Sequence, residues 1–464
     1  MIRGCENILA PINKIPPEIL ALIPDFWDTR HRDEGVITLT HVCHAWREIF
    51  VSRSSLWTNF DCLDEEKTRV YFERSKSSPI DLSLDPSKGI LPCDPIFQII
   101  PHATGRLKSL FIRGPTEDVE VVTSHLSHPA PLLERLSIHS DLQNAQDRNP
   151  ALPSTFFNED LSSLRMLYLN FVHTELPWRN MVNLASLTLS NIPPGAVSTG
   201  QLLDFLESAP YLEEVKFCYA TPTTGIQGGR LVSLACLKSM EIYSDGPISI
   251  LLDHLLIPVG AKLETYANLP VSPIGEHLPR SLDNLKNLSD FTVIELHPEE
   301  YYQDMKFSGP NGQVNITIRT SRDDPTGSML DSLAKLDTSK TERLEMNTGN
   351  LLSREPFYRA LLPMKDLRIL ALSGCTNPDI FICALQPPTS LLEAMVCPKL
   401  EEIILILQFE GMFDITSMIE MAAARASGGK KLRTIRIVDG REGFGLNVSE
   451  LRRHVWNVEY GPEV

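Results

Sequence analysis

The chain of 464 residues contains no uninterrupted apolar run of about 18 residues, the length that a membrane-spanning helix requires. Its first residues, MIRGCENILAPINK, lack the continuous apolar segment of a secretory signal. The sequence therefore predicts a protein with no membrane partner, located in the cytoplasm or the nucleus.

Paired cysteines and excess basic charge are also lacking. The nine cysteines never occur as Cys-x-x-Cys, and their odd number and scattered positions exclude a zinc ribbon or a disulfide framework. We expect free thiols in a reducing compartment, and no metal or other cofactor.

Lys and Arg total 43 against 59 Asp and Glu, a formal net charge of −16. This balance disfavours nucleic acid as the main partner, because its phosphates demand clustered Lys and Arg.

Phosphate-binding glycine loops, the nucleophile elbow Gly-x-Ser-x-Gly and the zinc motif His-Glu-x-x-His are missing as well. From the absence of these motifs we predict that the protein is not an enzyme. The least implausible catalytic site is HLSH, where His125 and His128 are three residues apart and Asp118 or Glu120 is near. A loop entering the following PAPLL is the simpler interpretation.

The stretch THVCHAWREIF, residues 40–50, combines a cysteine, two histidines and a tryptophan. If it continues one helix, six residues share an apolar face within an arc of roughly 120°: Leu39, Val42, Cys43, Trp46, Ile49 and Phe50. His41, His44 and Glu48 would share another arc, where a surface metal site is a weaker alternative to a solvated face. Cys43 would then be a small buried apolar residue and not a catalytic thiol.

A phrase of the form Leu-x-x-Leu-x-Leu recurs along the rest of the chain. Clear copies begin at Leu107, Leu133, Leu164, Leu184, Leu212, Leu237, Leu288, Leu367, Leu400 and Leu432, with weaker ones at Leu263, Gln313 and Thr341. From first to last, the mean spacing is about 27 residues, typical of leucine-rich repeats.

Within each phrase the fourth and sixth positions alternate with polar neighbours, as in a strand with one buried face. Helical stretches lie between phrases at 199–210, 248–257 and 414–426. The predicted fold class is α/β: a solenoid with a curved parallel sheet on the concave side and helices on the convex side. A doubly wound α/β enzyme also alternates strands and helices, but it needs no recurring phrase.

Positions three, five and seven of each phrase should point outward and line the concave face. They include both bases and acids, so net charge does not identify the partner. Among them we predict five residues to bind a protein substrate: Arg113, Tyr168, Tyr243, Arg343 and Arg436.

The segment before the repeats resembles an F-box, whose pattern runs Leu-Pro-x-Glu-Ile, then a leucine, Val-Cys-x-x-Trp-Arg and Leu-Trp. These places are held here by Ile15, Pro16, Glu18, Ile19, Leu39, Val42, Cys43, Trp46, Arg47, Leu56 and Trp57. The resemblance implies a three-helix module that docks on the Skp adaptor of a cullin-RING ubiquitin ligase. It also implies adaptor contact or module core for Ile15, Pro16, Pro17, Glu18, Ile19, Val42, Cys43, Trp46, Leu56 and Trp57.

The resulting organisation is an F-box-like module (1–62), a linking helix and first repeat (63–106), a leucine-rich-repeat domain (107–440) and a C-terminal cap (441–464). The predicted function is substrate receptor of a Skp–cullin–F-box ubiquitin ligase, with an unknown protein as target. A leucine-rich-repeat scaffold without a role in degradation is the alternative.

Overall fold

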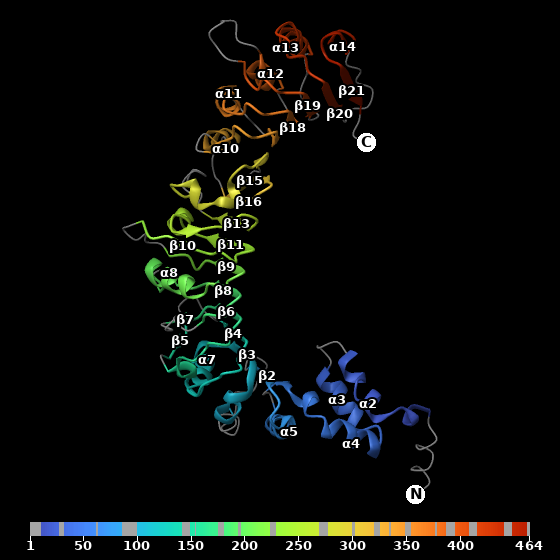
Figure 1. The fold of residues 1–464 in the computed structure, drawn as a ribbon, viewed down its shortest axis with the longest axis vertical. Coiled ribbons are helices and arrows are strands. Elements are labelled where there is room, and N and C mark those ends of the chain that lie inside the picture. Colours follow the sequence, from blue (N-terminus) through green and yellow to red (C-terminus); the bar gives the residue numbers. More distant parts are fainter. Residues whose placement is uncertain are drawn as a thin grey trace. The chain divides into compact units, whose positions relative to one another are not determined.

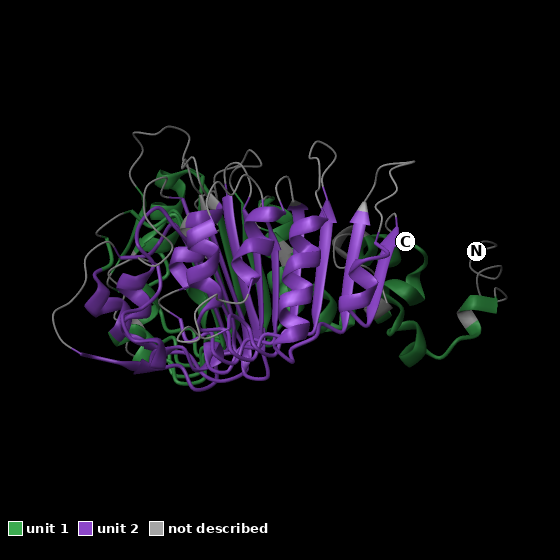
Figure 2. Ribbon diagram, turned by 90° about the horizontal axis from the view of Figure 1, so that it is seen from above, with its two compact units in different colours: residues 1–197, 204–212 green, residues 198–203, 213–464 purple. Residues whose placement is uncertain are grey.

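A computed structural model describes residues 11–26, 32–61, 64–85, 100–141, 149–153, 155–174, 181–193, 196–222, 229–268, 277–298, 302–319, 325–333, 336–348, 354–375, 378–386, 395–407, 415–439 and 448–461. The chain divides into two compact units (Figure 2). Unit 1 comprises residues 1–197 and 204–212, and unit 2 comprises 198–203 and 213–464.

Unit 1 begins with short helices, which we call the N-terminal helical segment. They are η1 (Pro11–Lys14), α2 (Pro17–Leu20), η2 (Ile23–Phe26), α3 (Arg32–Thr40), α4 (His44–Ser52) and η4 (Ser54–Trp57) (Figure 1). Pro17 occupies the first turn of α2, where a missing N–H costs nothing. Buried apolar residues of α2, α3 and α4 include Leu20, Val36, Leu39, Trp46 and Phe50.

The prediction of one helix across residues 39–50 is wrong. Helix α3 ends at Thr40, and α4 begins at His44 after Cys43, whose extended backbone (φ −160°, ψ 172°) forms the N-cap position. Arg47 Nε donates a hydrogen bond to the Thr40 carbonyl at 2.9 Å. The last carbonyls of a helix have no partner within the helix, so this bond satisfies one of them. Val42 is consequently exposed in the turn and Cys43 is half-buried, so they do not join an apolar helix face.

Parallel strands form the sheet of unit 1, paired in the order β1-β2-β3-β4-β6-β8. Their bounds are β1 Asn59–Asp61, β2 Ile80–Leu84, β3 Leu107–Gly114, β4 Arg135–Ser140, β6 Met166–Asn170 and β8 Ser186–Ser190. Strands β5 (Ala151–Leu152) and β7 (His173–Thr174) form a small sheet of their own. The helical elements are α5 (Glu65–Ser75), η6 (Thr104–Arg106), α7 (Thr116–Ser124) and η7 (Phe156–Glu159). The segment 63–106, predicted to hold a linking helix and the first repeat, contains α5 and β2, but the first strand of the sheet is β1, which precedes α5 and pairs with β2 in parallel.

In unit 2 the strands pair in the order β9-β11-β13-β16-β15-β14-β17-β18-β19-β20-β21. The bounds are β9 Glu214–Cys218, β11 Ser239–Ser244, β13 Lys262–Ala267, β14 Val293–Pro298, β15 Tyr302–Gly309, β16 Gly312–Arg319, β17 Arg343–Asn347, β18 Ile369–Cys375, β19 Glu402–Leu407, β20 Thr434–Asp439 and β21 Asn457–Gly461. Strands β10 (Val232–Ser233) and β12 (Leu255–Leu256) pair separately.

Helices α10 (Pro325–Leu333), α11 (Arg354–Leu361), α12 (Asp379–Leu385), α13 (Thr416–Ser427) and α14 (Leu451–His454) belong to unit 2. Each contacts the next in chain order, and they cover one face of their strands (Figure 2). Further helical elements are α8 (Thr199–Ser208), α9 (Ser249–Leu252), η10 (Leu282–Asn284) and η11 (Lys286–Leu288).

Strand order departs from chain order at β14, β15 and β16. Strand β13 pairs with β16 in parallel, β15 is antiparallel to both β14 and β16, and β14 resumes parallel pairing with β17. The β15–β16 turn lies tightly over the start of β14, since a Cβ on Gly309 would meet the Cα of Phe291 at 2.8 Å. The prediction of a parallel sheet is therefore wrong at this point, although the α/β class with a large, mostly parallel sheet is confirmed.

The burial predicted for the phrase is confirmed in its clear copies, except the one counted from Leu288: in β3, Leu107, Leu110 and Ile112 are buried while Phe111 and Arg113 are more accessible. The register assigned to three copies is wrong. Val293 pairs with Arg343, so the phrase counted from Leu288 starts instead at Phe291. By the same pairing argument, the copies counted from Leu263 and Gln313 start at Gly260 and Asn311.

Among the predicted helices, 199–210 and 414–426 are confirmed as α8 and α13. The stretch 248–257 holds only the short α9 before strand β12. The C-terminal residues expected to form a cap include α14 and β21, which adds another parallel strand beside β20. Within the described part of the chain, no helix is both long enough and apolar enough to cross a membrane.

Candidate functional site

Aromatic side chains form the core of the N-terminal helical segment. The rings of Trp46 and Phe50 on α4 meet edge to face, with centroids 5.7 Å apart. Trp57 on η4 donates its Nε1–H to the Phe50 carbonyl at 2.9 Å, so its buried indole nitrogen is satisfied. These contacts tie η4 to α4.

The residues that carry the F-box resemblance divide by burial. Trp46, Leu56 and Trp57 are buried, while Ile15 and Cys43 are half-buried. Pro16, Pro17, Glu18, Ile19 and Val42 are exposed. The sequence could not separate core residues from surface residues in this set, and the structure does.

Exposed large apolar residues are concentrated in the N-terminal helical segment. Ile19 is 53% exposed and Val42 is 51% exposed. Ile12, Leu22 and Ile37 are exposed as well. Several exposed apolar side chains on so few residues are typical of a surface that binds another protein.

The histidine and cysteine candidates do not assemble into a metal or catalytic site. His44 Nδ1 lies 3.6 Å from Glu48 Oε1, and both side chains are largely exposed. His125, just after α7, contacts the Val121 carbonyl through Nδ1 at 2.9 Å, and His128 is exposed. Among the described residues, no group of three or more His, Cys, Asp and Glu side chains is suitably arranged to hold a metal ion.

No family model matches this chain, and no curated protein matches it either. The following surfaces are therefore characterised by their own geometry.

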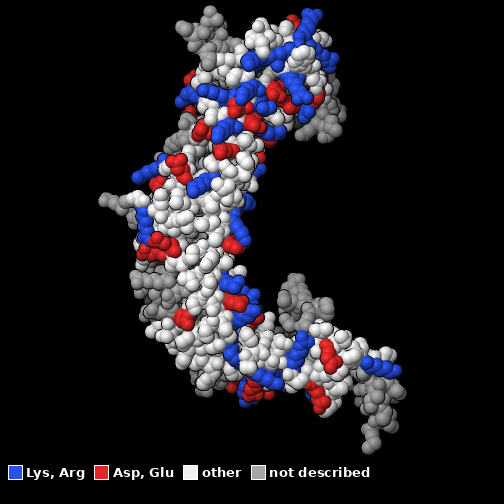
Figure 3. All heavy atoms as spheres, viewed as in Figure 1, with Lys and Arg blue, Asp and Glu red and all other residues white. Residues whose placement is uncertain are grey.

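The predicted substrate-binding arginines lie on the outward face of their strands, but each is paired with a carboxylate. Arg113 Nε is 3.3 Å from Asp141, Arg343 pairs with Glu345, and Arg436 Nε is 2.6 Å from Glu459. The hydrogen bond that Arg436 donates to Glu459 raises the pKa of Arg436. Figure 3 shows bases and acids intermingled over the elements from β17 to β21, not separated into patches of one sign.

The two predicted tyrosines differ in their surroundings. Tyr168 on β6 is half-buried and is in register with Ser137 and Thr188 on the neighbouring strands. Tyr243 on β11 lies beside another ring, that of Tyr266 on β13, with centroids 5.8 Å apart. Sequence reasoning missed Tyr266, because the copy counted from Leu263 put it at a buried position.

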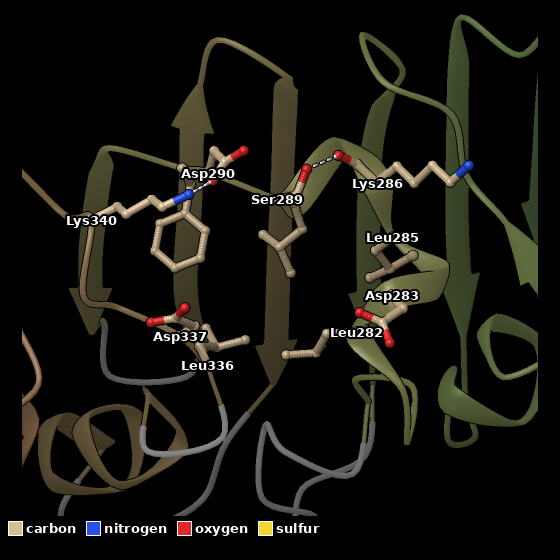
Figure 4. Close-up of a pocket in the computed structure, with 11 residues that line it drawn as sticks. Leu282, Asp283, Leu285, Lys286, Ser289, Asp290, Leu336, Asp337 and Lys340 are labelled. Atoms are coloured by element: carbon tan, nitrogen blue, oxygen red, sulfur yellow. Dashed lines mark hydrogen bonds and ion pairs between the residues drawn. The ribbon is translucent and has the colours of Figure 1, made fainter.

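A cavity of about 480 Å³ lies between the segments that lead into β14 and β17 (Figure 4). Its lining is both apolar and charged: Leu282, Asp283, Leu285, Lys286, Leu288, Ser289, Asp290, Phe291, Leu336, Asp337 and Lys340. Lys340 and Asp290 form an ion pair across it, and Ser339 lowers the pKa of Asp337 through two hydrogen bonds. The cavity adjoins the change in strand order, which no signal in the sequence predicted.

Cys236 and Cys397 should differ sharply towards thiol reagents. Cys236 is exposed, whereas Cys397 is buried and burial raises its pKa to about 12. Because the thiolate is the reactive form, we expect iodoacetamide at pH 8 to modify Cys236 and to leave Cys397 intact until the protein unfolds. Peptide mapping by mass spectrometry checks this, and equal rates in the folded protein would contradict it.

The raised pKa of Cys397 also makes the stability of the folded protein depend on pH. The folded pKa of Cys397 is raised above the unfolded value of about 8.5, so its contribution to stability is complete below that pH. That contribution should be lost as the pH rises towards about 12.

Proposed function

We propose that this protein is the substrate-receptor subunit of a Skp–cullin–F-box ubiquitin ligase. In this proposal residues 1–62 form an F-box-like module that docks on a Skp-type adaptor, and through it on a cullin. Residues 63–106 provide a linking helix and first repeat, 107–440 form a leucine-rich-repeat solenoid that binds a target protein, and 441–464 complete it.

One observation supports the proposal: apolar residues that match the F-box pattern are exposed on the surface of the N-terminal helical segment. Ile19 and Val42 are apolar and about half accessible, while Trp46, Leu56 and Trp57 of the same pattern are buried. A small helical segment with exposed apolar residues gains stability when a partner covers them. A docking module requires both a buried core that keeps it folded and exposed apolar residues that a partner can cover.

The repeat assignment is supported by the match between phrases and parallel strands. In β17, β18, β19 and β20 each phrase supplies one strand, and helices α10 to α13 follow their strands or precede them on one face. Units that bury their apolar positions only by stacking are typical of solenoids. The β14–β16 hairpin arrangement would then be an insertion between repeats.

We assign no catalytic residue to the chain. The ligase reaction would be carried out by other subunits, and this chain would contribute two binding surfaces. The target surface would be the outward face of the strands, which holds Arg113, Tyr168, Tyr243, Arg343 and Arg436.

The test is assembly of the complex from purified parts. We expect the intact chain, a Skp-type adaptor and a cullin to elute together in size-exclusion chromatography at the mass of a 1:1:1 complex. A double variant, Ile19→Asp with Val42→Asp, should elute alone while keeping its circular dichroism spectrum, because both residues are exposed. A folded intact chain that never joins the adaptor would contradict the proposal. If the complex forms but deleting the protein stabilises no target in cells, the scaffold alternative is the better account.

A further inference from the structure

Three tyrosine rings form a continuous row on the outward face of the unit 2 sheet. Tyr243 on β11 and Tyr266 on β13 have centroids 5.8 Å apart, and Tyr266 and Tyr302 on β15 have centroids 5.9 Å apart. All three side chains are half-buried. We call these residues the tyrosine row.

The altered strand order creates this row. Strand β15 is antiparallel, so its first residue, Tyr302, pairs with Arg319 at the end of β16. Tyr302 thus lies at the same edge of the sheet as Tyr266, near the end of β13. On β16, Thr317 is in register with Tyr266 on one side and with Asp304 on the other, so Tyr302 is offset from Tyr266 by two residues along the strands. A plain repeat would not have brought a third ring to this place.

Two carboxylates, those of Asp304 and Asp245, lie beside the row, and neither has a basic partner among the described side chains. Asp304 shares the outward face of β15 with Tyr302, and its Oδ1 is buried without a hydrogen bond. Asp245 follows β11 and accepts a hydrogen bond from the Asn268 amide at 3.1 Å. Its negative charge also contributes, after burial, to raising the pKa of Tyr219, the exposed residue that follows β9.

Other acidic residues on the same face are paired with lysines, unlike Asp304 and Asp245. Glu241 pairs with Lys216 at 2.5 Å, Glu264 with Lys262 at 2.7 Å, and Glu295 with Lys306 at 2.8 Å. At the Tyr266–Tyr302 end of the tyrosine row, aromatic rings therefore lie beside a carboxylate that has no basic partner among the described side chains, whereas Lys216 Nζ already lies 5.4 Å from the Tyr243 ring centroid.

This combination selects a planar cation. An arginine guanidinium can stack on a tyrosine ring and donate two parallel hydrogen bonds to a carboxylate, whereas lysine offers only a compact point charge. The protein makes such a contact internally: the Arg74 guanidinium lies 4.3 Å from the ring centroid of Trp57. A buried, unsatisfied carboxylate oxygen gains most from a charged donor.

We infer that the tyrosine row, together with Asp304 and Asp245, binds an arginine side chain of the target protein. The inference rests on the proposed function, in that it assigns a chemical class to the segment that the receptor recognises. The arginine would lie over Tyr266 or Tyr302 and donate to Asp304. The predicted contact Tyr243 would then act at one end of the row, while the paired arginines Arg343 and Arg436 would not bind the target through free charge.

The experiment uses the full chain and three acetylated, amidated glycine peptides that carry two arginines, two lysines or two glutamines. Isothermal titration calorimetry at low salt should detect the arginine peptide and give weaker binding for lysine and none for glutamine. Tyr266→Leu and Tyr302→Leu should each weaken arginine binding about 3- to 30-fold, the range of cation–π contributions. Asp304→Asn should weaken it by a similar factor.

Matched controls separate this site from general attraction by the acidic chain. Tyr358→Leu removes a ring on α11, and Asp366→Asn removes one negative charge from the pair with Lys399. Both controls should change the affinity less than twofold. Equal binding of the arginine and lysine peptides, or equal effects of site and control variants, would overturn the inference.

Adaptor affinity, measured on the same preparations, distinguishes this failure from that of the proposed function. If the adaptor binds and the arginine peptide does not, the inference alone fails. If the adaptor does not bind the intact chain, the ligase proposal fails, and arginine binding at the row stands as a property of the sheet.

Discussion

Replacing Trp57 with alanine is expected to lower the free energy of unfolding of unit 1 by about 3–5 kcal/mol. Trp57 is 1% exposed, and its ring meets that of Tyr71 on α5 edge to face at 4.9 Å. Its Nε1–H also bonds to the Phe50 carbonyl on α4. Truncation would leave a cavity where α4, η4 and α5 meet, and an unpaired carbonyl, so we also expect weaker adaptor binding.

Trp456 provides the matched control. It is 74% exposed and has Lys431 Nζ 4.4 Å from its ring centroid. Trp456→Ala should cost less than about 1 kcal/mol, as is usual for surface substitutions with one weak contact. Urea unfolding followed by far-ultraviolet circular dichroism measures both variants. A Trp57→Ala variant no less stable than Trp456→Ala would contradict the packing described here.

Replacing Arg425 with methionine is expected to destabilise unit 2 by about 2–4 kcal/mol. Arg425 on α13 is fully buried, and its guanidinium donates to the carbonyls of Val396 at 3.1 Å and Cys397 at 2.7 Å. It also reaches the Leu385 carbonyl at the end of α12 at 3.5 Å. Methionine fills similar space but donates nothing, so these buried acceptors would lose a charged donor.

The expected loss is limited because burial of the charge itself is unfavourable. Burial lowers the pKa of Arg425, which measures part of that cost. Arg433 is exposed, so Arg433→Met should change stability by less than about 0.5 kcal/mol. Guanidinium unfolding, with hydrogen exchange of the α13 amides as a local readout, tests the difference. Equal stability of Arg425→Met and Arg433→Met would contradict this prediction, because the carbonyls that Arg425 binds would then not need its hydrogen bonds.

The recurring phrase predicted most strands because it is a local pattern with a local cause. Buried Leu110 and Ile112 alternate with accessible neighbours in β3, and period-two alternation specifies a strand with one buried face. The copies counted from Leu263, Gln313 and Leu288 were placed in the wrong register for the same reason. Leu288 satisfies the pattern but lies in η11, and only the pairing of Val293 with Arg343 identifies Phe291 as the true start.

The errors near Cys43 and β15 depend on contacts between distant residues. A helical wheel cannot detect that Cys43 is extended, or that Arg47 bonds back to Thr40. Likewise, the alternation within 302–319 is compatible with strands in any order, since register and direction are set by tertiary pairing. The tyrosine row follows from that pairing and could not be predicted.

At the candidate docking segment, the sequence predicted which residues are involved but not their roles. The resemblance treated Val42 and Trp46 alike, although one is exposed and the other is buried. On the sheet, the outward positions of Arg343 and Arg436 were predictable from alternation. Their partners Glu345 and Glu459 were not, because an ion pair depends on side-chain conformations and strand neighbours.

The most direct test of the central claim is the affinity of the intact chain for a purified Skp-type adaptor, measured by isothermal titration calorimetry. We expect nanomolar binding by the intact chain and at least a hundredfold loss in the variant with Ile19→Asp and Val42→Asp. That variant should unfold at the same urea concentration as the intact chain, because both side chains are exposed. Absence of binding by the folded intact chain, or full binding by the double variant, would contradict the account.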